Sequence, residues 1–135
     1  FTTEIGKAVT LSAGNKFAII TYGLGVHWAL DYIKNNPECG ANLIDLRTLQ
    51  PWDKETVAAA VKSTGRVLIL HEDTLTNGFG AEISAWIGEH CFQYLDAPVL
   101  RCASLGTAIP MSKVLEDDFL AKARLAETID KLLKY

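Results

Sequence analysis

Short runs of consecutive apolar residues alternate along this chain with longer segments whose apolar residues recur every three or four positions. Runs of the first kind are typical of strands buried in a sheet, and segments of the second kind are typical of helices with one apolar face. A further strand at residues 5–11 is expected at one edge of the sheet, paired antiparallel. The buried strands that the runs predict lie at residues 17–22, 41–46, 67–70 and 98–102.

The segments between these runs predict helices. Pro37 ends the first helix, because the residue before a proline avoids helical backbone angles. Asp53 can cap the next helix through its carboxylate, and Gly65 can terminate it. The clearest amphipathic helix covers residues 78–91. The faces expected to be buried are Val26, Ala29, Leu30 and Ile33; Val57, Ala60 and Val61; Phe79, Ile83, Trp86, Ile87 and His90; and Leu125, Ile129, Leu132 and Leu133.

Alternating strands and helices predict an α/β domain of three layers. We expect a doubly wound, mostly parallel sheet of five strands with one antiparallel edge strand, in a single domain over residues 1–135. Ligands of such sheets bind beyond the carboxyl ends of the strands. The loops after Tyr22, Leu46 and Leu70 are therefore the first places to look for a site.

Composition and charge narrow the functional classes. With 13 basic and 16 acidic residues spread along the chain, the net charge of −3 predicts neither a nucleic-acid partner nor an anionic membrane surface. The apolar runs are far shorter than the roughly 20 residues that span a bilayer. No secretory signal is visible and the chain does not begin with Met, so we expect a fragment of a longer intracellular protein. Cys39, Cys91 and Cys102 match no metal or redox spacing and are expected to be reduced.

Two groups of residues resemble chemical motifs without completing them. Gly23 and Gly25 follow a strand, as in phosphate-binding loops, but Trp28 stands where the dinucleotide motif needs a third glycine; a tight turn is the favoured interpretation. Asp45 and Arg47 are expected to form a structural ion pair.

Histidine and tryptophan side chains supply the remaining candidates. His71 and Glu72 follow a strand end and could border a site, but no nucleophile or metal partner accompanies them, which favours structural or interface roles. Trp86, on a helix face, is a possible interface residue; burial inside the domain is the alternative for it, as for Trp28 and Trp52.

Several sequence blocks, in order, resemble the C-terminal domain of the beta portion of 2-oxoacid dehydrogenase decarboxylating components. Within that family, Trp52 and His71 more resemble the branched-chain (2-oxoisovalerate) type than the pyruvate type. One departure is the loop at residues 106–110, where relatives carry a carboxylate and this chain has none. The blocks are Ile5-Gly6-Lys7-Ala8, Asp45 to Asp53, Ser63-Thr64-Gly65-Arg66, His71-Glu72, Gly78 to Ile83, and Leu95-Asp96-Ala97-Pro98 with Arg101.

This resemblance implies a transketolase C-terminal-like fold and a parent enzyme that oxidatively decarboxylates 2-oxoacids and acylates lipoyl groups. Thiamine diphosphate and Mg²⁺ would be held by the alpha portion and the preceding domain, so no cofactor, catalytic or metal-binding residue is assigned to this chain, and the isolated domain is expected to be inactive. The alternatives are the equivalent domain of pyruvate dehydrogenase and a free-standing flavodoxin-like binding module.

The resemblance also implies contact functions. The partners would be a second copy or an alpha subunit, together with the acyltransferase core, in the bacterial cytoplasm or the mitochondrial matrix. Asp96 and the terminal carboxylate of Tyr135 match the positions with which family members meet basic residues of the acyltransferase.

Overall fold

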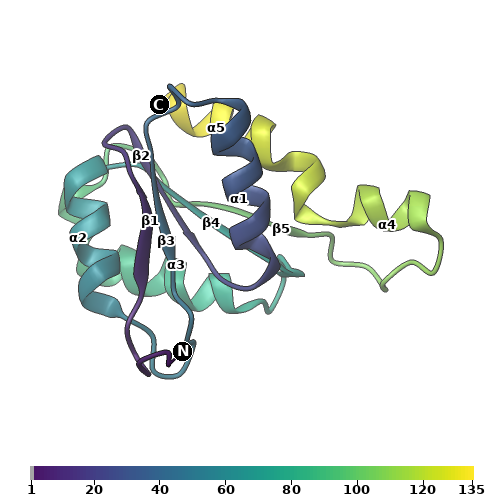
Figure 1. Ribbon diagram of the computed structural model, residues 1–135, viewed down its shortest axis with the longest axis horizontal. Helices are drawn as coiled ribbons and strands as arrows, with labels where there is room; N and C mark the ends of the chain where they lie inside the picture. Colours follow the sequence, from purple (N-terminus) through teal and green to yellow (C-terminus); the bar gives the residue numbers. More distant parts are fainter. Residues whose placement is uncertain (1) are drawn as a thin grey trace.

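Five strands form one sheet in the order β1-β3-β2-β4-β5 in the computed structural model, which describes residues 2–135 (Figure 1). The chain alternates strands with α-helices, and two short 3-10 helices, η1 and η2, precede β5 and α5 respectively. The elements are β1 (Val9–Ala13), β2 (Phe17–Thr21), α1 (Leu24–Asn35), β3 (Ala41–Asp45), α2 (Lys54–Thr64), β4 (Val67–Thr74), α3 (Phe79–His90), η1 (Phe92–Tyr94), β5 (Leu100–Ser104), α4 (Lys113–Phe119), η2 (Ala121–Arg124) and α5 (Leu125–Leu133).

The sheet confirms the predicted fold class. β2 pairs in parallel with both β3 and β4, and β4 pairs in parallel with β5. The edge strand β1 runs antiparallel to β3, with Val9 opposite Asp45 and Ala13 opposite Asn42. This strand begins at Val9, later than the sequence pattern indicated.

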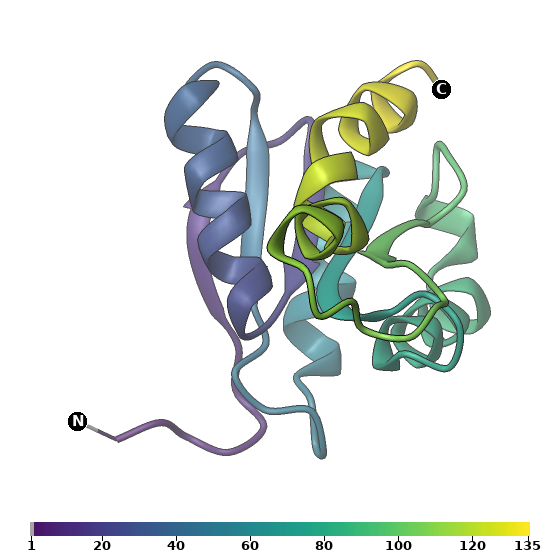
Figure 2. The ribbon, with the colours of Figure 1, turned by 90° about the vertical axis from the view of Figure 1, so that its right-hand side faces the viewer.

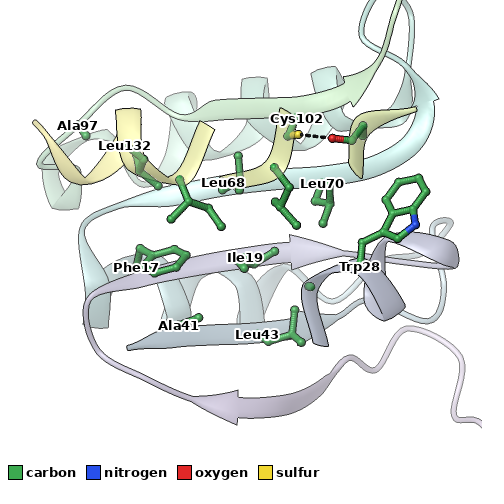
Figure 3. Packing of buried hydrophobic residues seen from close by; sticks show 14 residues of the cluster. Phe17, Ile19, Trp28, Ala41, Leu43, Leu68, Leu70, Ala97, Cys102 and Leu132 are labelled. Atoms are coloured by element: carbon green, nitrogen blue, oxygen red, sulfur yellow. Dashed lines mark hydrogen bonds between the residues drawn. The ribbon is translucent and has the colours of Figure 1, made fainter. Parts of the chain in front are cut away.

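Apolar side chains pack on both faces of the sheet, because the central strands are buried throughout. On one face Phe17, Ile19 and Leu68 meet residues of α1 and α5 (Figure 3). On the other face Ala18, Ile20 and neighbouring strand residues meet α2 and α3. Successive residues of a strand point to opposite faces, so continuous apolar runs supply both layers at once.

Local sequence signals account for the ends of α2. The carboxylate of Asp53 accepts hydrogen bonds from the Thr56 amide at 3.0 Å and from the Thr56 hydroxyl at 2.8 Å. At the other end Gly65 adopts a left-handed conformation with φ of 67°, where a side chain would be strained. Both ends, and the buried stripe of Val57, Ala60 and Val61, agree with the sequence interpretation.

Besides the late start of β1, several helix and strand details differ from the sequence pattern. His90 in α3 and Leu133 in α5, both expected on buried faces, are exposed. In α1 the buried large residue is Trp28, whereas Leu30 is 40% exposed, because the helix turns its Gly25–Trp28 side toward the sheet. β4 does not stop at Leu70 but continues to Thr74, so His71, Glu72 and Asp73 belong to a strand and not to a loop. β5 starts at Leu100, after the turn that contains Pro98.

A segment that the sequence pattern left without structure leaves the body of the domain between β5 and α5. We call residues 105–120 the arm; it contains α4 and extends to the right in Figure 1 and toward the viewer in Figure 2. Its apolar residues Val114 and Leu115 do not reach the core. No periodic stripe facing a core marks this helix in the sequence, which explains why the pattern missed it.

Candidate functional site

Strands β2 and β4 are neighbours in the sheet, yet the helices that follow them cover opposite faces. α1 contributes Trp28 to one core layer, and α3 contributes Ile83 to the other. Loops that diverge in this way leave a crevice at the carboxyl ends of the strands, where ligands bind in open α/β sheets. A cavity of about 350 Å³ lies there, lined by Tyr22, Glu72, Asp73, Thr74, Ile109, Glu116, Phe119 and Leu120.

His71 lies beneath this crevice with both ring nitrogens engaged by the backbone. Its side chain is fully buried. Nε2 accepts a hydrogen bond from the Gly80 amide at 3.1 Å, so the ring proton is on Nδ1, which lies 3.1 Å from the Asp73 carbonyl oxygen. Burial lowers the pKa of His71, and the positive charge of Arg101 adds to that effect, while Asp73 opposes it. His71 is therefore a neutral residue that ties the start of α3 to the end of β4.

Two glycines leave room for this ring. A Cβ atom added to Gly80 would collide with Nε2 of His71, and one added to Gly78 would lie 2.7 Å from its Cε1. Real Cβ atoms essentially never come that close to a rigid ring. The Gly78-Phe79-Gly80 sequence and the buried histidine thus form one packing unit at the helix start.

Tyr22 connects the buried histidine with the cavity. Its ring stacks on His71 with centroids 5.8 Å apart and meets Phe79 edge-on at 6.5 Å. Desolvation, helped by the negative charge of Asp73, raises the pKa of Tyr22 to about 12. The phenol therefore stays protonated at neutral pH and can donate a hydrogen bond at the cavity wall.

The cavity combines apolar walls with carboxylates. Glu72, Asp73 and Glu116 are exposed at its border, whereas Phe119 is buried behind it. Glu72 also holds the next strand in place, because its carbonyl oxygen accepts a hydrogen bond from the Ser104 hydroxyl. No lysine or arginine belongs to the residues that line this cavity.

Asp96 and Tyr135 lie at the opposite end of the sheet. Asp96 is exposed, its amide donates to the Gly65 carbonyl at 2.7 Å, and its carboxylate lies 4.0 Å from the Arg66 guanidinium. Tyr135 is 55% exposed. Their neighbours Ala97 and Leu132 lie side by side near the amino ends of the parallel strands (Figure 3). The fold thus brings these two sequence-distant residues to one end of the domain.

Around Asp96 the surface is hollowed. A cavity of about 530 Å³ is lined by α3, η1 and the turn before β5. Phe92, at its border, is 74% exposed. The lining residues are Ser84, Gly88, Phe92, Leu95, Asp96, Ala97, Pro98 and Val99.

The three tryptophans differ in exposure. Trp28 and Trp52 are 6% and 7% exposed, so both are core residues. Trp86 is only partly buried; it meets Trp52 edge-on at 5.1 Å and stacks on His90 at 4.6 Å. Trp86 is therefore the most exposed of the three tryptophans.

The incomplete motifs have structural explanations. Gly23 starts α1 with φ of 58°, and a Cβ atom on Gly25 would collide with the Thr21 hydroxyl and lie 3.2 Å from the Leu70 carbonyl oxygen. The turn and the close approach of helix to sheet account for both glycines. Arg47 and Asp45 form the expected ion pair at 3.7 Å. The three cysteines carry free thiols, and the Cys102 thiol donates to the Ala121 carbonyl at 3.3 Å (Figure 3).

Comparison with known proteins decides the family. Residues 6–124 match the family described as the transketolase C-terminal domain. The chain belongs to this family. A solved structure titled "Split gene transketolase, inactive beta4 tetramer" has the same fold as this transketolase C-terminal domain, with a TM-score of 0.82 at 21% identity. The likeness covers 99% of this chain and 43% of that chain.

Curated relatives of this transketolase C-terminal domain include beta subunits of 2-oxoisovalerate and pyruvate dehydrogenases. The mitochondrial 2-oxoisovalerate dehydrogenase subunit beta of Dictyostelium discoideum is 44% identical over 79% of this chain and 30% of its own length. The 2-oxoisovalerate dehydrogenase subunit beta of Bacillus subtilis is 39% identical over 89% of this chain and 38% of its own length. The pyruvate dehydrogenase E1 component subunit beta of Mycoplasma pneumoniae is 36% identical over 99% of this chain and 42% of its own length. The chain thus spans about a third to two fifths of the length of these relatives.

The lining of the cavity at the carboxyl edge does not fit a thiamine diphosphate–Mg²⁺ group. Residues 2–135 contain no cluster of three or more His, Cys, Asp or Glu side chains that could hold a metal ion. The carboxylates of Glu72, Asp73 and Glu116 would repel a diphosphate in the cavity at the carboxyl edge. Arg101 and Arg124, which line another cavity, donate to backbone carbonyl oxygens.

Sequence reasoning missed two parts of the site. It pointed to the loop after Tyr22 but did not use the tyrosine itself, and it gave no role to the arm. Consecutive exposed apolar residues in a segment that lacks a helical stripe were the available signal for the arm. Among residues 2–135, no helix is both long and apolar enough to cross a membrane.

Proposed function

We propose that this chain is the assembly and partner-docking domain of the beta portion of a thiamine-diphosphate-dependent 2-oxoacid dehydrogenase. The observation that carries the proposal is the match of residues 6–124 to the transketolase C-terminal domain together with the beta-subunit relatives. The parent enzyme oxidatively decarboxylates a 2-oxoacid and passes the acyl group to a lipoyl carrier. Its partners are an alpha subunit and an acyltransferase core, in the bacterial cytoplasm or the mitochondrial matrix.

We propose a branched-chain substrate. The relatives named for 2-oxoisovalerate support it, and so does the resemblance at Trp52 and His71. These two residues are buried in this domain, so they indicate descent and do not contact a substrate. The pyruvate enzyme is the second candidate, because the Mycoplasma pneumoniae relative aligns over 99% of the chain. Decarboxylation of 3-methyl-2-oxobutanoate and pyruvate by the complete enzyme separates the two.

Asp96 and Tyr135 are the proposed docking residues for the acyltransferase. Support comes from their exposure and from their position at the same end of the domain, beside a cavity of about 530 Å³. Carboxylates there would steer and orient a basic partner surface, which gives a salt-dependent association rate.

The test is binding of the complete enzyme to the acyltransferase core at low and high salt. Asp96→Ala is expected to slow association and to flatten its salt dependence, whereas Asp31→Ala, an exposed carboxylate on α1, serves as the matched control. Equal binding by wild type and Asp96→Ala would refute the docking role of Asp96.

A further inference from the structure

Basic side chains gather between β5, the last strand of the sheet, and α5. Arg101 lies on β5, Arg124 ends η2, and Lys131 lies in the last turn of α5. Two adjoining cavities of about 290 and 270 Å³ lie here, and Arg101, Arg124 and Thr128 line both of them. We call this pair of cavities the basic groove. Its larger part includes residues 104–106, at the carboxyl end of β5, where open α/β sheets bind ligands.

The backbone holds the two arginines in place. Arg101 donates to the Leu75 carbonyl oxygen at 2.8 Å. Arg124 donates to three carbonyl oxygens at 2.8, 2.8 and 3.0 Å, one of them that of Ala103 on β5. The thiol of Cys102 bonds to the backbone of η2 and keeps it on the strand (Figure 3). Guanidinium groups fixed in advance lose little side-chain freedom when an anion binds.

No carboxylate of the described residues neutralises these two groups. Within residues 2–135, neither Arg101 nor Arg124 takes part in an ion pair. Both side chains are partly buried, and charges withdrawn from water are normally paired. Of the residues that line the two cavities, Glu127 alone carries a carboxylate, and Lys131, one turn further along α5, adds a third cation. The basic groove therefore has an excess of positive charge.

Both arginines keep hydrogen-bond donors for a ligand. A guanidinium has five N–H groups, of which Arg101 uses one and Arg124 uses three, so four and two remain. The nitrogens without a partner are Nε and Nη2 of Arg101 and Nε of Arg124, and none of them is buried away from solvent. The hydroxyl of Thr76, which lines the larger cavity, can add another donor.

Charge and size select the class of ligand. A phosphate group carries about −1.5 to −2 charges at pH 7 and several acceptor oxygens, so it can neutralise both guanidinium groups. A single carboxylate would leave one of them without a counter-charge. The two volumes lie just below the range of about 300–1,000 Å³ that is typical of ligand pockets, which favours a small molecule over a coenzyme.

We propose that the basic groove binds phosphate, either free or as the monoester of a small molecule. Arg101 and Arg124 hold the phosphate oxygens, and Lys131 attracts the anion from the border. The site is independent of the proposed docking function, because Asp96 and Tyr135 line neither cavity. Either proposal can therefore fail while the other stands.

The experiment is calorimetric titration of the complete protein with inorganic phosphate, glycerol phosphate and acetate at constant ionic strength. Wild type is expected to bind both phosphates saturably, at one site per chain, and to bind acetate at least about tenfold more weakly. Tighter binding of glycerol phosphate would assign the site to a phosphorylated small molecule. Equal binding of the two would assign it to free phosphate.

Three variants connect binding to the basic groove. Arg101→Gln should raise the Kd for phosphate at least about tenfold, because charge-assisted hydrogen bonds are lost. Lys131→Glu removes no hydrogen bond of the fold and should raise the Kd about threefold. Lys34→Glu is its matched control, since Lys34 is also an exposed lysine in the last turn of a helix, and its Kd should equal that of wild type. If Arg101→Gln does not fold, as circular dichroism would show, the two lysine variants decide.

Several results would overturn the proposal. One is the absence of saturable phosphate binding by the complete wild-type protein. Another is a Kd that neither Arg101→Gln nor Lys131→Glu changes. Equal losses in Lys131→Glu and Lys34→Glu would show that only net charge matters. Acetate that binds as tightly as phosphate would mean an adventitious ion only.

Discussion

The amide of Gly80 donates a hydrogen bond to Nε2 of His71 at 3.1 Å. This bond joins the first turn of α3 to the last part of β4 and fixes the imidazole as a neutral acceptor. It explains why the His71-Glu72 and Gly78-Phe79-Gly80 blocks occur together in this sequence: the histidine needs the donor, and the glycines provide the space.

Stability should fall as the pH drops below about 6.5, the ordinary pKa of histidine. The folded protein binds a proton at His71 less readily than the unfolded chain does, because burial lowers the pKa of His71. Its contribution is thus complete above the unfolded pKa and is lost as the pH falls toward the folded pKa. Urea unfolding between pH 5 and 8 measures this slope. His71→Gln should reduce the slope, and His27→Gln, on the exposed side of α1, should not; identical slopes in all three proteins would contradict the assignment.

The same substitution at two positions of α3 should have opposite effects. Gly80→Ala places a Cβ against the His71 ring and should destabilise the fold by about 1–3 kcal/mol, as overpacked cores do. A Cβ on Gly88 meets nothing within 4 Å, so Gly88→Ala should stabilise the helix by roughly 0.5–1 kcal/mol. Thermal unfolding of both variants checks the pair. Destabilisation of equal size at both positions would show that the His71 ring does not impose the requirement.

Asp53 should stabilise the fold fully at pH values above the pKa of its carboxyl group in the unfolded chain. Its carboxylate accepts bonds from the amides of Thr56 and Ala8 and from the Thr56 hydroxyl; burial alone would raise its pKa, but these bonds outweigh it and the pKa is lowered. The stability is therefore present above the unfolded pKa and lost as the pH falls through the folded one. Asp53→Ala should cost about 1–2 kcal/mol at pH 7, typical of a lost helix cap. Chemical denaturation at pH 7 and pH 3 measures it, with Asp31→Ala as the control, and an equally small loss in both variants would contradict the capping role.

Removal of the Arg124 side chain should loosen the arm. Arg124→Gln cannot donate to three carbonyl groups at once, so hydrogen exchange in residues 105–120 should speed up while the central strands keep their protection. Lys122→Gln changes an exposed cation beside it and should leave exchange unchanged. Unaltered exchange in Arg124→Gln would show that the arm is held by other contacts.

Much of the fold follows from the sequence because the core strands are continuous apolar runs with turn signals at their ends. Phe17–Thr21 and Ala41–Asp45 are such strands, and Asp53 with Gly65 marks both ends of α2. The apolar pattern predicts too short a β4 because Glu72 and Asp73 are polar. The strand nevertheless continues beside β5 to Thr74. The predicted buried face of α1 differs from the observed one because the helix approaches the sheet closely at Gly25. Residue spacing does not reveal this close approach.

The candidate site was less predictable for a related reason. Tyr22, Glu72 and Glu116 come together only through the strand order and the path of the arm, neither of which has a local signal. The apolar residues of the arm face away from the core. They therefore do not form the periodic buried stripe from which a helix is predicted. The docking role of Asp96 and Tyr135 is predicted from the family resemblance, because residue spacing in the sequence gives no signal for it.

The central claim is that this domain supplies contacts while the cofactor is held elsewhere in the assembled enzyme. Calorimetric titration of thiamine diphosphate with Mg²⁺ into the 135-residue chain tests it most directly, with the complete enzyme as the positive control. The account predicts no saturable binding to the isolated chain and saturable binding to the complete enzyme. Saturable, stoichiometric binding to the isolated chain would contradict it.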